Sequence, residues 1–237
     1  MSLEGERQRI ENAAKWYLNE ELGIDRRLIR YRYETMRPVL TGRYGLELGS
    51  AEGVMTEMLA PHFLQLTVVE GSLELVSAIP SLANTEVICS LFENFEPERL
   101  YDVIVADHVL EHVEDPGGFL ESARGWIGPG GRMVIGVPNG NSIHRLAAVK
   151  MGMLASPTAL NERDVAVGHR RVYTKESLLA EIASAGLVVA AVWGVFLKPL
   201  SNSQIEATWS PAMMDGFYEL GKEFPDLCAE LLVVAHW

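Results

Sequence analysis

The stretch "YGLELGSAEGVMTEMLA", residues 44–60, joins a short apolar segment, a turn of small residues and the start of a helical sequence. Apolar residues without alternation are typical of a strand that is buried on both faces of a parallel sheet. Gly49, Ala51 and Gly53 let a ligand approach the backbone, and a helix that begins just after them directs its free amide groups into the same space. We therefore expect a strand, loop and helix that bind a nucleotide or a similar ligand.

Six further apolar segments follow this stretch. Four are "QLTVVE" (65–70), "TEVIC" (85–89), "YDVIVAD" (101–107) and "GRMVIGVP" (131–138), and two more, "LVVAAVWGVFL" and "CAELLVVAHW", lie near the end of the chain. Short strands that alternate with helical sequences indicate βαβ units with right-handed crossovers. The sequence predicts an α/β fold: a doubly wound, seven-stranded, mostly parallel, Rossmann-like sheet with helices on both faces.

A chain of 237 residues is long enough for one core, so we expect a single domain. Residues 1–40 are rich in helix formers and predict an N-terminal helical cap before a cofactor-binding half at 41–138. Residues 139–173 lose periodicity and predict an insertion or lid with one short helix around 143–153. A substrate-side half at 174–237 begins with a threonine-capped helix and contains another helix within 210–224.

The net charge of −12, from 20 Lys+Arg against 32 Asp+Glu, repels phosphate backbones and anionic lipids. This composition argues against nucleic acid or a membrane as the main partner and favours a small-molecule substrate. The two cysteines form no CxxC pair, and we find neither a signal peptide nor an apolar segment long enough to span a bilayer. We expect a cytoplasmic protein, with a homodimer as one assembly that these features allow.

The spacing of the small residues distinguishes between cofactor classes. A dinucleotide fingerprint would need glycine at position 54, where this chain has Val54. The chain offers Glu47-x-Gly49-x-Ala51-x-Gly53 instead, and Glu70 ends the next strand, where a carboxylate can accept hydrogen bonds from both ribose hydroxyls. The additional carboxylate of Glu47 favours a nucleoside with a cationic amino-acid tail over one with two phosphates.

These segments resemble the class I S-adenosylmethionine-dependent methyltransferases, in particular the small-molecule group with the ubiquinone-biosynthesis O-methyltransferases. The likeness covers residues 43–138 and resumes over 168–186, and its motifs are "ELGSAEG", "YDVIVADHVLEHVEDP" and "GPGGRMVIGVPN". The resemblance implies an antiparallel last strand and methyl transfer from S-adenosylmethionine to an oxygen or nitrogen of a small molecule. The alternatives are an NAD(P)-dependent oxidoreductase and a non-catalytic protein that binds S-adenosylmethionine.

The resemblance also implies which residues contact the cofactor. Ala51 replaces a family glycine, which we expect to be sterically mild, and Ser90 stands where relatives have an acidic contact to adenine. Adenine recognition would then use the Ser90 hydroxyl and the backbone of the two residues after it, and Arg32 would pair with the cofactor carboxylate. The expected cofactor contacts are Arg32, Glu47, Gly49, Ser50, Ala51, Gly53, Glu70, Gly71, Ser72, Ser90, Leu91, Phe92, Asp107 and His108.

Catalysis would need a base if the acceptor carries a proton at neutral pH. His169, within "GHRRVYT", is the preferred general base, and His108 and His144 are further candidates. An alternative remains open, in which His169 and Tyr173 only attach the insertion to the core. The residues expected at the substrate are His112, Asn139, Tyr173 and Lys198.

His108, Glu111 and His112 in "HVLEHV" would share one face of a helical turn, which suggests a metal site. H-x-x-E-H is also the inverted zinc-protease signature, but here it directly follows a buried strand of a nucleotide-type sheet. Related ubiquinone-pathway enzymes have a glutamate in place of His108, and some bind magnesium there. Because imidazole is a poor ligand for magnesium, we prefer the interpretation that His112 packs within the fold while His108 or Asp107 borders the cofactor. A metal site at His108, Glu111 and His112 stays open as an alternative.

Overall fold

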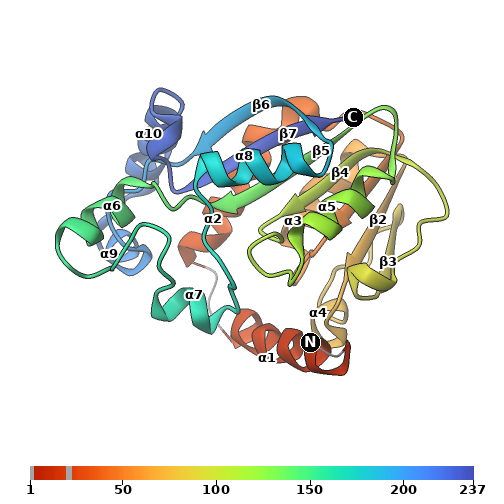
Figure 1. The fold of residues 1–237 in the computed structure, drawn as a ribbon, viewed down its shortest axis with the longest axis horizontal. Coiled ribbons are helices and arrows are strands. Elements are labelled where there is room, and N and C mark those ends of the chain that lie inside the picture. Colours follow the sequence, from red (N-terminus) through yellow and green to blue (C-terminus); the bar gives the residue numbers. More distant parts are fainter. Residues whose placement is uncertain (1–2, 20–22) are drawn as a thin grey trace.

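A single seven-stranded sheet forms the centre of the computed structural model, which describes residues 3–19 and 23–237 (Figure 1). The strand order is β3-β2-β1-β4-β5-β7-β6, and β7 runs in the direction opposite to the other six strands. The expected fold class and the antiparallel last strand are therefore confirmed. The strands are β1 Tyr44–Leu48, β2 Gln65–Glu70, β3 Thr85–Cys89, β4 Tyr101–Asp107, β5 Ile127–Pro138, β6 Val188–Val195 and β7 Glu230–His236.

Helices connect these strands and precede the first one. The α-helices are α1 Leu3–Asn19, α2 Gly23–Met36, α3 Val54–Leu59, α4 Leu73–Val76, α5 Pro116–Arg124, α6 Ile143–Lys150, α7 Glu162–Ala166, α8 Lys175–Ser184, α9 Asn202–Thr208 and α10 Pro211–Gly221. Four 3-10 turns complete the set: η1 Arg37–Val39, η2 Ala60–His62, η3 Phe92–Asn94 and η4 Pro225–Leu227.

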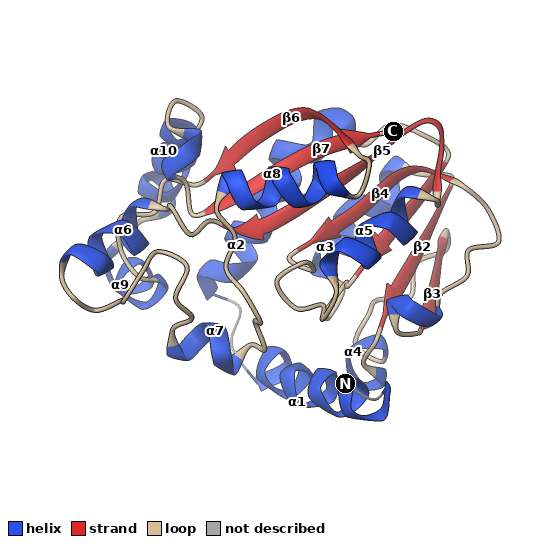
Figure 2. Ribbon diagram, viewed as in Figure 1, coloured by secondary structure: helices blue, strands red, loops and turns tan. Residues whose placement is uncertain are grey.

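The sheet is buried on both faces, as its continuous apolar strands require. On one face, α5 and α8 pack over a cluster that includes Leu46, Ile104 and Leu178 (Figure 2). On the other, residues of α2, α3, α9 and α10 pack against Leu66 and Val103. Neighbouring residues of a strand thus contribute to opposite clusters, and both faces of the sheet are buried.

The strand order places a crevice at one edge of the sheet. The chain winds outward from β1 to β3 in one direction and from β4 to β5 in the other, so the connections diverge between β1 and β4. Ligands of open α/β sheets bind beyond the carboxyl ends of the strands at such a reversal. Because β7 is antiparallel, its first residue, Glu230, lies at this same edge, paired with Pro138 of β5 and Val195 of β6.

The boundaries of the first four strands agree with the sequence prediction, whereas β5 begins at Ile127 instead of residue 131. The additional residues pair with β4 through a shift in register between Tyr101 and Val103. The 139–173 segment contains two helices, not one, and the second, α7, has a capping box formed by Asn161 and Asp164. The assignment of this segment as a lid stays a prediction. Across the described ranges, the structure has no helix with the length and apolarity needed to cross a bilayer.

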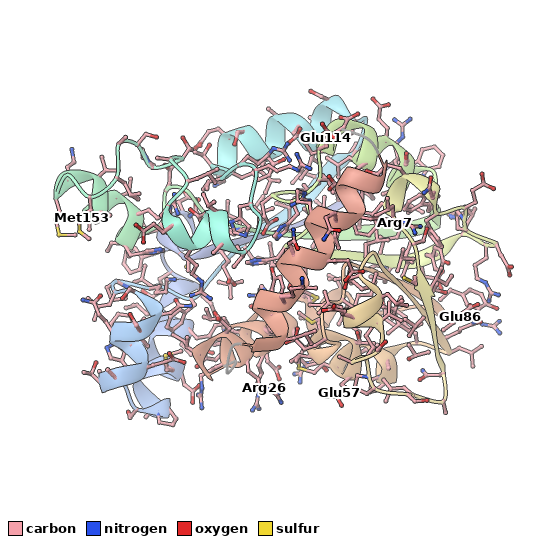
Figure 3. All side chains as sticks on the ribbon, turned by 90° about the horizontal axis from the view of Figure 1, so that it is seen from below. Arg7, Arg26, Glu57, Glu86, Glu114 and Met153 are labelled. Atoms are coloured by element: carbon pink, nitrogen blue, oxygen red, sulfur yellow. The ribbon has the colours of Figure 1, made fainter. Side chains whose placement is uncertain are left out.

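The N-terminal helix α1 crosses the molecule at the carboxyl ends of the strands. Figure 3, which labels Arg7 on this helix, shows α1 in front when the molecule is seen from below. Arg9 attaches α1 to the core, because its guanidinium donates to the carbonyl oxygens of Gly168 and His112 at 2.9 Å each. Arg170 adds a second attachment through an ion pair with Glu6 at 2.5 Å. The helices α1 and α2 occupy the region of the predicted N-terminal cap, and the role of this region as a cap stays a prediction.

Candidate active site

One cavity of about 370 Å³ lies at the carboxyl edge of the sheet, beneath α1. Its volume is in the range of pockets that hold small molecules and cofactors. Seventeen of the twenty predicted site residues line it. They are Arg32, Glu47, Gly49, Ser50, Ala51, Glu70, Gly71, Ser90, Leu91, Phe92, Asp107, His108, His112, Asn139, His144, Lys198 and His169.

Three of the twenty predicted site residues do not line this cavity. Gly53, Ser72 and Tyr173 lie outside it. The Ser72 hydroxyl donates to Glu11 at 2.7 Å, and the Tyr173 hydroxyl donates to Glu181 of α8 at 2.5 Å. The positions of these two side chains therefore favour structural roles in attaching α1 and α8.

The loop after β1 has the open backbone that its small residues predict. Gly49, Ala51 and Gly53 all have positive φ angles, of 72°, 48° and 87°. A side chain at Gly49 would meet Val109 at 2.9 Å, so glycine is required there for space as well as for conformation. Ala51 is in the left-handed region, which costs an L-residue about 1–2 kcal/mol. The replacement of the family glycine is therefore less mild than the sequence suggested.

The carboxylate of Glu70 connects this loop to the end of β2. Its two oxygens accept hydrogen bonds from the backbone amides of Ala51 at 3.2 Å and Ser72 at 2.9 Å. Burial raises the pKa of Glu70, and these amides oppose the shift. Each carboxylate oxygen can accept more than one hydrogen bond, so Glu70 can still bind a pair of hydroxyl groups in the cavity.

Glu47 lies deeper, within β1, and accepts a hydrogen bond from the Thr56 hydroxyl at 2.6 Å. Burial raises its pKa to about 8, although the bond from Thr56 opposes this. A nearby cation would stabilise its ionised form, so Glu47 can respond to a ligand that carries an ammonium group.

The residues expected at adenine lie together after β3. Leu91 is buried, and Phe92 packs against Phe119 with ring centroids 5.2 Å apart. The Ser90 hydroxyl donates to the carbonyl oxygen of Leu91 at 2.9 Å. Because this bond engages the hydroxyl proton, the Ser90 hydroxyl can accept hydrogen bonds from a ligand but does not donate one.

Arg32 has partners other than the one predicted for it. Its guanidinium binds Asp107 at 2.6 Å and Glu230 at 2.8 Å, which connects α2 to β4 and β7. Arg32 lines the cavity, but this geometry commits two of its nitrogens to protein carboxylates and does not support a simple pairing with a cofactor carboxylate. Asn139 is similarly committed, because its amide group donates to the carbonyl oxygens of Asp226 and Cys228 at 2.9 Å each.

The prediction that His108, Glu111 and His112 share a helical face is wrong. Residues 108–112 form a non-helical turn, and His108 has a φ of 59°, which is outside the helical region. Glu111 still lies 3.3 Å from Nδ1 of His108. A residue from another segment also approaches Glu111: Nε2 of His169 lies 4.0 Å from the same carboxylate oxygen.

Glu111 is fully buried, and neither of its carboxyl oxygens has a hydrogen-bond partner within the described chain. Burial raises its pKa well above the ordinary value. Glu111, His112 and His169 have donor atoms within 4.8 Å of one another, so they are the group that could hold a metal ion. Two imidazoles and one carboxylate suit a transition metal such as zinc better than magnesium.

His169 contacts groups on two other segments, α7 and the turn after β4. Its Nδ1 lies 3.3 Å from Asp164 of α7, and its ring packs edge-on against His112 with centroids 4.8 Å apart. Burial lowers the pKa of both His112 and His144 to about 3, so these two imidazoles are neutral at pH 7. A carboxylate beside one ring nitrogen can fix the orientation of a histidine and leave the other nitrogen to accept a proton.

Sequence reasoning missed Glu230, Asp164 and the α1 residues that line the cavity. Glu230 begins the last strand, whose antiparallel direction the resemblance implied, but the prediction did not extend to where the first residue of that strand would lie. Only the reversed direction of β7 brings it to the site. Asp164 carried a signal, because "NERD" at 161–164 has the spacing of a capping box. The helix α1 falls within the predicted N-terminal cap, but no pattern in it identifies the side chains that line the cavity.

Residues 23–192 match the model of a protein family described as a methyltransferase domain. The chain belongs to this methyltransferase family. The match confirms the predicted enzyme class, a methyltransferase of the S-adenosylmethionine-dependent type, and does not favour the oxidoreductase alternative.

Curated relatives include a ubiquinone biosynthesis O-methyltransferase from Coxiella burnetii, 24% identical over 181 residues that cover 73% of this chain and 76% of the relative. Among solved structures, the N-methyltransferase NodS from Bradyrhizobium japonicum, in complex with S-adenosyl-L-homocysteine, is similar with a TM-score of 0.59. It is 18% identical, with 98% of this chain and 96% of NodS covered. An S-adenosylmethionine-dependent methyltransferase from Mesorhizobium loti has a TM-score of 0.62 at 16% identity, with coverage of 87% and 98%.

Proposed function

We propose that this methyltransferase transfers the methyl group of S-adenosylmethionine to an oxygen or nitrogen of a small-molecule acceptor. The observation that carries this proposal is the single cavity that joins the Gly49–Gly53 loop and Glu70 to a group of buried histidines. The first part has the open backbone and the carboxylate that a nucleoside needs. The second has polar groups suited to a proton acceptor.

The cofactor would supply an activated methyl group, and the protein would align the acceptor and exclude water. Glu70 would bind the ribose hydroxyls, and the two backbone amides that donate to its carboxylate support this role. Ionised Glu47 would attract the ammonium group of the amino-acid tail. The segment after β3, with Leu91 and Phe92, would hold the adenine ring.

His169 is the proposed general base, and Asp164 is its proposed positioning residue. The carboxylate of Asp164 lies beside Nδ1, so Nε2 is the nitrogen that can take a proton from the acceptor. Positioned general bases typically contribute about 10²- to 10⁴-fold to a rate. Burial of the site beneath α1 would exclude water from the reacting groups.

A comparison of ligands by thermal denaturation tests this proposal. S-Adenosylhomocysteine at ~100 times its Kd should raise the midpoint by about 5–10 °C, whereas NAD at the same concentration should have no effect. Stabilisation by NAD alone would favour an oxidoreductase. Binding of S-adenosylhomocysteine without methyl transfer to any acceptor in a metabolite screen would favour a non-catalytic binding protein.

A further inference from the structure

Lys198 follows β6 and lines the same cavity as the histidines. Its ammonium group donates to the side-chain oxygen of Asn202 at 2.8 Å. Within the described chain, no carboxylate lies within 4.0 Å of that ammonium nitrogen. Lys198 is therefore a half-buried positive charge whose side-chain partner is a neutral amide.

The other cations around this part of the cavity already have carboxylate partners. Arg145 binds Asp164 at 3.1 Å, and Arg163 binds Asp25 at 2.6 Å. Arg145 also donates to the carbonyl oxygens of Pro157 and Ala159. Among the described cations that line this part of the cavity, Lys198 is therefore the one without a carboxylate partner, and its charge can stabilise an anionic ligand.

A second lining group has unused hydrogen-bonding capacity beside Lys198. Nδ1 of His144 is buried without a hydrogen-bond partner. His144 is also close enough to Lys198 for the ammonium charge to lower the pKa of its imidazole, after the larger effect of burial. A half-buried charge without a carboxylate partner and a buried ring nitrogen without a hydrogen-bond partner both favour a ligand that supplies the missing interaction.

We propose that Lys198 binds an oxyanion of the methyl acceptor, a carboxylate or a phosphonate, and so selects anionic small molecules. This inference rests on the proposed function, because it concerns the acceptor of that reaction. The neutral imidazole of His144 would provide a second polar contact to the same group. The acceptor would then carry its hydroxyl or amine toward His169 and its negative charge toward Lys198.

The protonation of Lys198 gives this site a pH dependence. Burial lowers its pKa to about 8, with Glu230 opposing the shift. Lys198 is therefore protonated and positively charged at pH 7, and it loses this proton as the pH rises through about 8. Oxyanion binding should weaken above that pH. The charged groups that face Lys198 are Glu230 of β7, Asp25 of α2, Arg163 of α7 and Arg145 of α6, with His144 of α6 as the neutral titratable neighbour.

Methylphosphonate is a suitable probe, because it carries the proposed charge and its ³¹P signal reports binding directly. Protein saturated with S-adenosylhomocysteine should bind it in a saturable manner at pH 7. Lys198→Met should weaken binding at least tenfold, and Lys198→Arg should retain it and remain active above pH 8. Lys150→Met, which removes an exposed lysine outside the cavity, is the matched control and should bind as the wild type does.

The proposal is overturned if the wild-type protein does not bind the probe, or if folded Lys198→Met binds it equally well. Thermal denaturation of each variant establishes that it is folded. A turnover assay then uses hydroxy- and amino-carboxylic acids, each paired with its uncharged amide. Preference for amides would also contradict the proposal. The affinity for S-adenosylhomocysteine is measured separately, so the cofactor assignment can stand even where the acceptor assignment fails.

Discussion

Ala51 shows how a single residue can be strained at the centre of a binding loop. Its φ of 48° is costly for alanine and unrestricted for glycine. We predict that Ala51→Gly raises the free energy of unfolding by up to about 1 kcal/mol, because the relief of strain exceeds the added entropy of the unfolded chain. Ala51→Val should lower it, since a β-branched side chain fits this region worse. Equal stability of these two variants in urea denaturation would contradict the strain.

Asp164 provides a second test at the scale of a residue. Asp164→Asn keeps an oxygen for the cap of α7 but removes the charge beside His169. We predict that it lowers kcat about tenfold or more and leaves the KM for S-adenosylmethionine unchanged, as expected for a group that acts through a general base. In a His169→Gln background the same substitution should cause no further loss. An equal additional loss in that background would show a role independent of His169.

Among the elements, α1 is the one whose attachment to the core should control the cofactor. Arg9 holds it through the carbonyl oxygens of Gly168 and His112. Arg9→Ala should increase the dissociation rate of S-adenosylhomocysteine several-fold, measured by stopped-flow fluorescence. Thr174→Ala is the control, because it removes the N-cap of α8, outside the cavity, and should cost about 1 kcal/mol of stability without changing that rate. Equal rates for all three proteins would exclude α1 as a cover of the site.

The elements also show how far sequence reasoning reaches in this protein. The limits of β1 to β4 and the helices α8 and α10 follow from apolar periodicity and capping, which are local properties. Glu230 and the contact between His169 and Glu111 depend on which segments meet in space, and local patterns do not encode that. His108 was misassigned for a related reason, because its spacing suits a helix while its backbone forms a turn at a strand end.

At the scale of the whole molecule, buried carboxyl groups should make the ligand-free protein less stable at mildly alkaline pH. Glu47 has a folded pKa of about 8 against an ordinary value of 4.5, so the folded protein holds a proton that the unfolded chain releases. Stability should fall as the pH rises toward 8, by about 1.4 kcal/mol per pH unit for this group. His112 and His144 act in the opposite direction below pH 6.5. Denaturation of Glu47→Gln across pH 6.5–8 should show a smaller slope, and an unchanged slope would contradict the buried proton.

The central claim is that the loop at Gly49–Gly53 and the carboxylate of Glu70 together hold an adenosine. Isothermal titration of the purified protein with S-adenosylhomocysteine tests it most directly. We predict binding at one site, weakened about tenfold or more by Glu70→Ala, since charge-assisted hydrogen bonds contribute about 1.5–3 kcal/mol. The absence of measurable binding of either S-adenosylhomocysteine or S-adenosylmethionine to the folded wild-type protein would contradict the account.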